Sequence, residues 1–194
     1  MKTAFLKGGA LALAACLAAC TTSGGGGERG MRTGGIEVGR FHLGQPIAHA
    51  QIAIEPYDRA DAMRPEFAAA SAAVARQLTR LGWTVLPTAG KSEQVALVAV
   101  QQGSRETISA ASAARIGRGV GGLPATGSSA GVVATLLEVG IRRRSDGTVF
   151  WEGRAVSEAR SGTPEASAGA QADRLAEALF RDFPGESGRI IRVR

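Results

Sequence analysis

The chain has 194 residues, of which 44% are hydrophobic, 21% charged and 5% aromatic, and its formal net charge is +6. This length and composition predict one folded domain with a sizeable core and exclude a wholly disordered protein. The apolar runs fall short of the roughly eighteen residues that a membrane-spanning helix needs, so the sequence predicts no such helix.

The first twenty residues have the pattern of a bacterial export signal. Lys2 and Lys7 form a short positive region ahead of an apolar run over residues 8–19. Such a run is too short to cross a bilayer as a helix and is typical of a signal peptide. It ends in the sequence LAAC at residues 17–20, after which the chain turns polar. A leucine, two small residues and a cysteine resemble a bacterial lipobox, so we predict a signal peptide at residues 1–19 and acylation of Cys20.

Cys16 ends a second LAAC sequence, at residues 13–16. We favour Cys20 because it lies at the polar boundary, whereas cleavage before Cys16 would leave a shorter apolar core. An ordinary secretory signal with incidental cysteines is a further alternative. If Cys20 is acylated, the mature chain has no other cysteine, which excludes a disulfide framework, a cysteine-ligated metal and a cysteine nucleophile.

The predicted anchor implies a location. Two or three acyl chains hold a protein stably on a bilayer, where one chain would not. Thr21, and not an aspartate, follows the cysteine. By resemblance to Gram-negative lipoproteins, this implies lipid anchoring in the outer membrane, facing the periplasm. Residues 20–35 then comprise the acylated cysteine and a Gly-rich tether with a reach of about 20 Å, and residues 36–194 form the domain.

The sequence of the first half of this domain predicts strands before and after one helix. Strands are expected at 36–41, at 48–55 and at 83–86. A helix is expected from Pro65 to Leu81, because its apolar residues form one stripe, proline suits the first helical turn and Gly82 suits the end. Residues 94–102 are apolar on both faces, which predicts a central strand covered on both sides.

The second half predicts a loop, a hairpin and a second helix. Residues 103–130 are rich in Gly, Ala and Ser, so we expect a long loop, disordered or functional. Residues 132–142 and 149–158 predict a hairpin, joined through Asp146 and Gly147. A helix is expected from Thr163 to Pro184, followed by an edge strand at 189–193. The predicted fold is α+β, a two-layer sandwich of a mixed or antiparallel sheet with two helices packed on one face.

Several motifs suggest chemistry but lack the context it needs. The GxGxxG match at 117–122 is not placed between a strand and a helix, as dinucleotide binding requires. The GxSxG match at 127–131 precedes a strand and has no histidine after it. His42 and His49 lack nearby cysteines or clustered carboxylates for a metal. Glu152 and Glu158 are explained by strand alternation and salt bridging. We therefore predict a non-enzymatic protein with no catalytic, cofactor-binding or metal-binding residues.

Basic residues gather at 142–144, and a second cluster comprises Arg189, Arg192 and Arg194. They are interpreted first as solvated strand edges that resist aggregation. The alternative is attraction to an anionic lipid or glycan. Nucleic-acid binding is not expected, because no aromatic residues interleave with the basic ones.

Four segments together resemble a known family: QIAIEP at 51–56, LGW at 81–83, VFWEGRA at 149–155 and LAEALFRDFP at 175–184. They are similar to Gram-negative bacterial lipoproteins with a C-terminal domain of unknown function, over roughly residues 36–188. The resemblance implies an envelope α+β domain without established catalytic residues. We expect a binding or structural module of the envelope, whose partner is an envelope protein or an anionic lipid or glycan. The alternatives are an accessory lipoprotein of an export or envelope-assembly complex and, less favoured, an envelope hydrolase.

Overall fold

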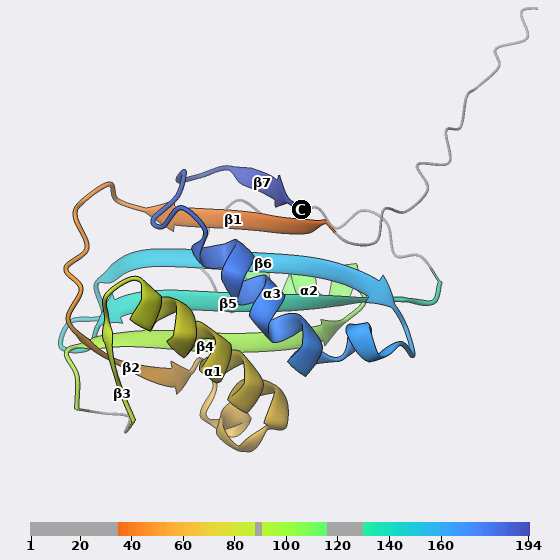
Figure 1. Cartoon of the computed structure of the whole chain (residues 1–194), viewed down its shortest axis with the longest axis horizontal. Coiled ribbons are helices and arrows are strands. Elements are labelled where there is room, and N and C mark those ends of the chain that lie inside the picture. Colours follow the sequence, from red (N-terminus) through yellow and green to blue (C-terminus); the bar gives the residue numbers. More distant parts are fainter. Residues whose placement is uncertain (1–34, 88–90, 116–129) are drawn as a thin grey trace, which may run out of the picture. The chain divides into compact units, whose positions relative to one another are not determined.

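A mixed sheet organises the part of the chain that the structure, a computed structural model, describes: residues 35–87, 91–115 and 130–194 (Figure 1). Within these ranges the sheet has seven strands, β1 (Ile36–His42), β2 (Gln51–Pro56), β3 (Thr84–Leu86), β4 (Gln94–Gly103), β5 (Val132–Arg143), β6 (Val149–Arg160) and β7 (Ile190–Val193). Their order across the sheet is β3-β2-β4-β5-β6-β1-β7. All described residues belong to one compact unit, Arg32–Arg194, with its own hydrophobic core.

The pairing confirms the predicted mixed sheet. β2 runs parallel to β3 and β4, whereas β4, β5, β6, β1 and β7 pair antiparallel. The predicted hairpin is β5–β6, and the predicted tail strand is β7, which pairs with β1 at one edge of the sheet. β4 is buried on both faces over most of its length, as its apolar sequence predicted.

Two helices, α1 (Pro65–Arg80) and α3 (Ala168–Phe180), lie in front of the sheet in Figure 1 and contact each other. Both contribute to one core cluster that also includes Val98 from β4 and Leu137 from β5. The bounds of α1 agree with the prediction. Pro65 is its first residue, and Gly82 just beyond its end has φ +100°, a conformation that glycine adopts without strain.

The start of α3 differs from the prediction. Thr163 does not cap the helix; its hydroxyl donates to the carbonyl of Arg160 instead. A 3-10 turn at Pro164–Ala166 comes first, as another, Arg59–Met63, precedes α1. Ser167 then caps α3, because its Oγ accepts from the N–H of Ala170 at 3.2 Å. Thr163 and Pro164 therefore precede and begin the 3-10 turn, and the α-helix itself begins at Ala168.

A third helix, α2 (Arg105–Arg115), occupies residues that the sequence analysis assigned to a loop. It lies behind the sheet in Figure 1, and its Ile108 packs with Ala134, Leu136 and Val156 in a separate small cluster. The strand alternation of β5 explains the two faces, since Leu136 points to this cluster and Leu137 to the main core. The α+β class is confirmed, but the predicted two-layer arrangement is not, because a helix also covers the second face. Residues 116–129 of the predicted loop lie outside the described residues.

The core on the α1 and α3 face is organised around Trp151. Its side chain is fully buried, its ring centroid lies 5.2 Å from that of Phe180, and its Nε1 donates to the carbonyl of Pro184 at 2.9 Å. Gly153 faces the same side of β6, and a Cβ atom there would lie 2.4 Å from the indole Cη2. The indole therefore occupies the space that any other residue at 153 would need.

Candidate ligand-binding site

The connection between β1 and β2, residues 43–50, crosses one end of the sheet near the β5–β6 turn (Figure 1). Two of the cavities in the described part of the chain are lined by residues of this connection. The first, which we name the Phe150 cavity, has a volume of about 350 Å³ and is lined by Leu43, Gln45, Pro46, Ile47, Ala48, Glu93, Gln94, Arg143, Thr148, Val149 and Phe150. The second, the His42 cavity, has about 450 Å³ and is lined by His42, Gly44, Gln45, Pro46, Ile47, His49, Leu81, Phe183 and Pro184.

One wall of the Phe150 cavity combines an aromatic ring with a cation. The guanidinium carbon of Arg143 lies 5.2 Å from the ring centroid of Phe150, close enough for a cation–π interaction. Its Nη1 donates to Oδ2 of Asp146 at 2.8 Å, and the N–H of Thr148 donates to Oδ1 of the same carboxylate at 2.9 Å. These contacts, that of Thr148 above all, lower the pKa of Asp146 to about 2. Asp146 is therefore ionised at neutral pH and holds Arg143 in place.

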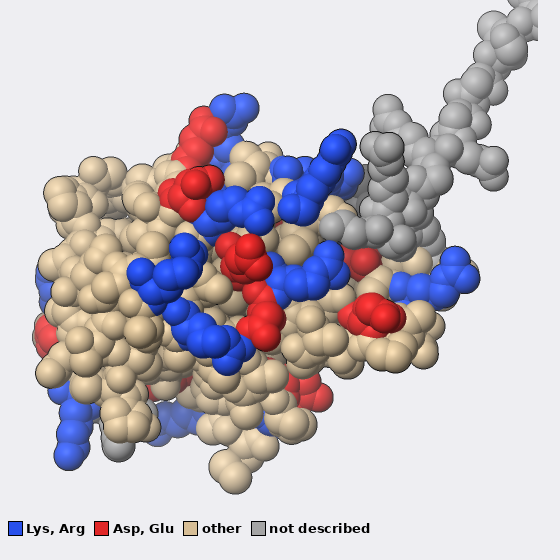
Figure 2. Space-filling view, in the orientation of Figure 1, with Lys and Arg blue, Asp and Glu red and all other residues tan. Residues whose placement is uncertain are grey.

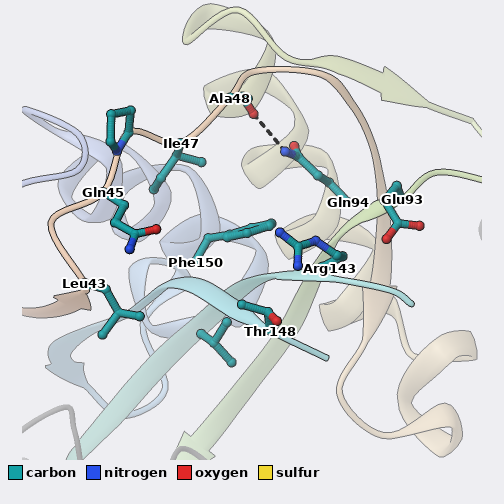
Figure 3. A pocket seen from close by; sticks show the side chains of 11 residues that line it. Leu43, Gln45, Ile47, Ala48, Glu93, Gln94, Arg143, Thr148 and Phe150 are labelled. Atoms are coloured by element: carbon teal, nitrogen blue, oxygen red, sulfur yellow. Dashed lines mark hydrogen bonds between the residues drawn. The ribbon is translucent and has the colours of Figure 1, made fainter. Parts of the chain in front are cut away.

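The part of the lining beside Arg143 includes Gln94, a buried residue at the start of β4. Its Oε1 accepts from Trp83 Nε1 at 2.8 Å, and its Nε2 donates to the carbonyl of Ala48 at 2.8 Å (Figure 3). Both ends of this amide are thus hydrogen-bonded inside the protein. The bond to Ala48 ties the 43–50 connection to the sheet, so the cavity has a fixed shape before any ligand arrives.

The structure brings His42 and His49 to the same cavity, although seven positions separate them in the sequence. The N–H of Gly44 donates to His42 Nδ1 at 3.1 Å, so Nε2 carries the proton of the neutral ring and donates to the carbonyl of Gly185 at 3.0 Å. The ring of His49 lies 4.0 Å from that of Trp83. Among the described residues, no cluster of three or more His, Cys, Asp or Glu side chains could hold a metal ion.

The three arginines at 142–144 do not form one anion-binding patch. Arg142 lies over the ring of Tyr57 at 5.9 Å, Arg143 lines the Phe150 cavity, and Arg144 donates to Glu55 Oε1 at 2.6 Å. The hydrogen bond that Arg144 donates to Glu55 raises the pKa of Arg144. Of these three guanidinium groups, the cavity receives that of Arg143.

Two of the three residues in the second predicted basic cluster also meet acidic partners. Arg189 pairs with Glu186 at 2.7 Å, and Arg192 with Glu37 at 2.6 Å. Acidic and basic side chains are likewise intermixed over the face that α1 and α3 cover, where Arg76 pairs with Asp173 (Figure 2). This visible face therefore has no large patch of one charge.

A buried polar network joins α2 to the sheet. Ser112 donates to the fully buried Glu138 and accepts from Arg154 Nη1 at 3.1 Å. Arg105, also on α2, donates to Glu158 Oε1 at 2.8 Å and forms an ion pair with Glu37. Glu158 is thus salt-bridged, as the sequence analysis interpreted it. Glu138 was missed because it is the one charged residue in the apolar run at 132–141, and Arg154 because it is one of several charged residues that alternate along β6.

Glu152 lies on the same face as this network. Burial raises the pKa of its carboxyl group, and the charge of Glu138 adds to the effect, while Arg154 and Arg142 oppose it. Neither Glu152 nor Glu158 lines the Phe150 cavity or the His42 cavity. The structure therefore does not bring the two candidate carboxylates to either cavity.

Arg40 is a buried cation that sequence reasoning also missed. Its Nε donates to the carbonyl of Leu179 and its Nη2 to the carbonyl of Ala178, both at 2.8 Å. These carbonyls belong to the last turn of α3, where unpaired acceptors and the negative end of the helix dipole favour a cation. Burial lowers the pKa of Arg40. The residue joins β1 to the end of α3.

Some predicted features lie outside the described residues. They are Cys16, Cys20, the match at 117–122 and the serines of the match at 127–131. No helix in the described part of the chain is long and apolar enough to cross a membrane.

Comparison with known proteins identifies distant similarity. No family model matches the chain. Uncharacterized protein ZMO1243 of Zymomonas mobilis subsp. mobilis is 29% identical over 212 aligned residues, which cover 82% of this chain and 80% of that protein.

Among solved structures, a PDZ domain protein from Parabacteroides distasonis aligns with a TM-score of 0.47 and 11% identity, covering 82% of this chain and 39% of that one. This chain thus spans about two fifths of that structure. A PelC dodecamer from Paraburkholderia phytofirmans aligns with a TM-score of 0.42 and 14% identity, covering 75% of this chain and 94% of the other.

Proposed function

We propose that this protein is a lipoprotein anchored in the bacterial outer membrane through acylated Cys20, and that its domain is a non-enzymatic binding module facing the periplasm. The observation that carries the proposal is the LAAC sequence at residues 17–20, placed where an apolar run meets a polar, Gly-rich segment. β1 begins at Ile36, directly after this predicted tether. The tether would hold a folded unit away from the bilayer surface.

The arrangement of charges supports binding more than catalysis. A general acid or base must reach the reacting group of a substrate. The buried carboxylate of Glu138 instead accepts from Ser112, and Glu158 is paired with Arg105. In the Phe150 cavity, the carboxylate of Glu93 accepts from the hydroxyl of Ser145. A fixed cavity with an apolar wall and a cation suits the holding of a ligand.

The anchor is tested with two matched substitutions in the full chain, Cys20→Ala and Cys16→Ala, expressed in a Gram-negative host. Intact mass and membrane fractionation are measured for each. We expect the wild type and Cys16→Ala to give an acylated, membrane-bound mature protein. The Cys20→Ala protein should keep its signal peptide or be absent from the membrane fraction. A Cys20→Ala protein with the wild-type mature mass and membrane binding would overturn the proposal.

A further inference from the structure

We propose that the Phe150 cavity binds a small anionic amphiphile, meaning an alkyl chain or ring that carries one carboxylate or phosphate. The proposal deepens the proposed binding function and rests on it for the ligand source, because an envelope protein is surrounded by molecules of this class. The cavity volume of about 350 Å³ lies at the lower end of the roughly 300–1,000 Å³ usual for small-molecule sites. A single short chain or ring suits it better than a whole phospholipid.

The apolar part of the ligand has a surface to cover. Phe150, Val149 and Ile47 line the cavity, and Leu43 stands at its rim with 65% of its surface exposed. Covering the exposed side chain of Leu43 with an apolar chain would remove apolar surface from water, which is favourable. Figure 3 shows Leu43, Ile47 and Phe150 around the same space, so one short chain would contact all three.

Arg143 supplies the site for the anion. Of its five N–H donors, the hydrogen bonds within the described residues use one, Nη1, which donates to Asp146. The edge formed by Nε and Nη2 can therefore take a carboxylate or phosphate in the paired geometry that guanidinium groups favour. Figure 3 shows the guanidinium end of Arg143 beside Phe150 and directed toward the cavity.

The neighbouring groups set the position of the ligand. The guanidinium of Arg143 already contacts Asp146 and the ring of Phe150, which reduces the side-chain freedom that binding would cost. Glu93 lies beyond Arg143, away from Leu43 and Gln45 (Figure 3). Its negative charge disfavours an anion on that side, so the head group should lie between Arg143 and Gln45, whose amide can donate a further hydrogen bond.

The test uses residues 21–194, which contain the whole compact unit Arg32–Arg194 and lack the predicted acyl anchor. Binding is measured by isothermal titration calorimetry with octanoate, octyl phosphate, octanol, octyltrimethylammonium and inorganic phosphate. We expect the two anionic amphiphiles to bind about tenfold more tightly than octanol. The cation and inorganic phosphate should bind weakly or not at all. A preference for octyl phosphate or for octanoate would separate a lipid-phosphate source from a fatty-acid source.

Two substitutions and two controls assign the binding to this cavity. Arg143→Gln should abolish the preference for octanoate over octanol, and Leu43→Gln should weaken both by several-fold. The matched controls are Arg189→Gln and Met63→Gln, at an exposed arginine and an exposed methionine that line neither cavity. They should bind as the wild type does.

The proposal is overturned if octanoate and octanol bind equally, if the cation binds best, if no ligand saturates the protein, or if the controls lose binding as the cavity variants do. Because residue 20 is absent from the protein tested, failure of the Cys20 anchor and failure of the ligand site are separate results.

Discussion

The packing of Trp151 over Gly153 predicts that Gly153→Ala destabilises the domain although it adds a single methyl group. That methyl group would lie 2.4 Å from the indole Cη2 and 2.8 Å from Leu179 Cδ1. Ordinary contact begins at 3.4 Å, so the ring would have to move by about 1 Å. Trp151 is fully buried and hydrogen-bonded to the carbonyl of Pro184, which leaves it little room to move.

The expected magnitude follows from three contributions. Overpacking a core costs about 1–3 kcal/mol. Weakening the indole hydrogen bond to Pro184 adds about 1 kcal/mol. Alanine has less conformational freedom than glycine in the unfolded chain, and this difference stabilises the folded state by about 0.4–1 kcal/mol. The free energy of unfolding should therefore fall by about 2 kcal/mol, which lowers Tm by about 4–8 °C in a domain of this size.

The measurement is urea unfolding followed by circular dichroism, with Gly169→Ala as the matched control. Gly169 is exposed on α3, and a Cβ atom there would meet only Ala69 at 4.0 Å. Alanine is the better helix former, so this control should be unchanged or up to about 1 kcal/mol more stable. If the two alanine variants have equal stability, the indole does not exclude a side chain at position 153 and the reasoning fails.

Two further predictions concern buried charge. Arg40→Met should lower the free energy of unfolding by about 2–3 kcal/mol, because the carbonyls of Ala178 and Leu179 lose their donors. Urea unfolding measures this change. If the variant is as stable as the wild type, the cost of burying the cation equals the stabilisation from its hydrogen bonds and the prediction is wrong. Since burial raises the pKa of Glu152, the folded state binds its proton more tightly than the unfolded state, so the wild type loses stability as pH rises through that pKa. At about pH 7, Glu152→Gln should thus be more stable than the wild type, and this difference in stability should shrink as the pH falls toward the ordinary glutamate pKa of 4.5. A difference in stability that does not change with pH would contradict a raised pKa for Glu152.

The sequence was sufficient where local pattern and burial agree. The stripe of α1, the two-sided apolar run of β4 and the turn residues of the β5–β6 hairpin each predicted the element that forms. These signals act over a few residues and the hydrophobic effect stabilises all of them. The boundary of α3 was harder, because Pro164 starts a 3-10 turn as readily as an α-helix.

Helix α2 was missed because its stabilising contacts come from distant strands. Within its described part, Ile108 is the one large apolar residue that is buried. Arg105 and Ser112 instead bind Glu37, Glu158 and Glu138, which lie on β1, β6 and β5. A pattern of Ala and Ser carries no hydrophobic period, and no local signal shows that three strands will bring carboxylates to this helix.

The candidate site could not be predicted from the sequence, for a related reason. No motif in the sequence marks residues 45–47, and the arginines at 142–144 were interpreted together as one basic cluster. Pairing of β4 with β5 separates these arginines, so that the side chain of Arg143 reaches Phe150 while that of Arg144 reaches Glu55. The chemistry of the cavity thus depends on strand register, which composition does not reveal.

The position of the cavity separates folding from binding in this domain. The residues that fill the main core, such as Trp151 and Leu179, point to the α1 and α3 face. Leu43 and Arg143 lie instead at the end of the sheet, with large exposed fractions of 65% for the residue Leu43 and 41% for the side chain of Arg143. Surface substitutions of this kind change stability by about 0.5 kcal/mol or less. Leu43→Gln and Arg143→Gln should therefore remain folded, so any loss of ligand binding in them can be attributed to the cavity itself.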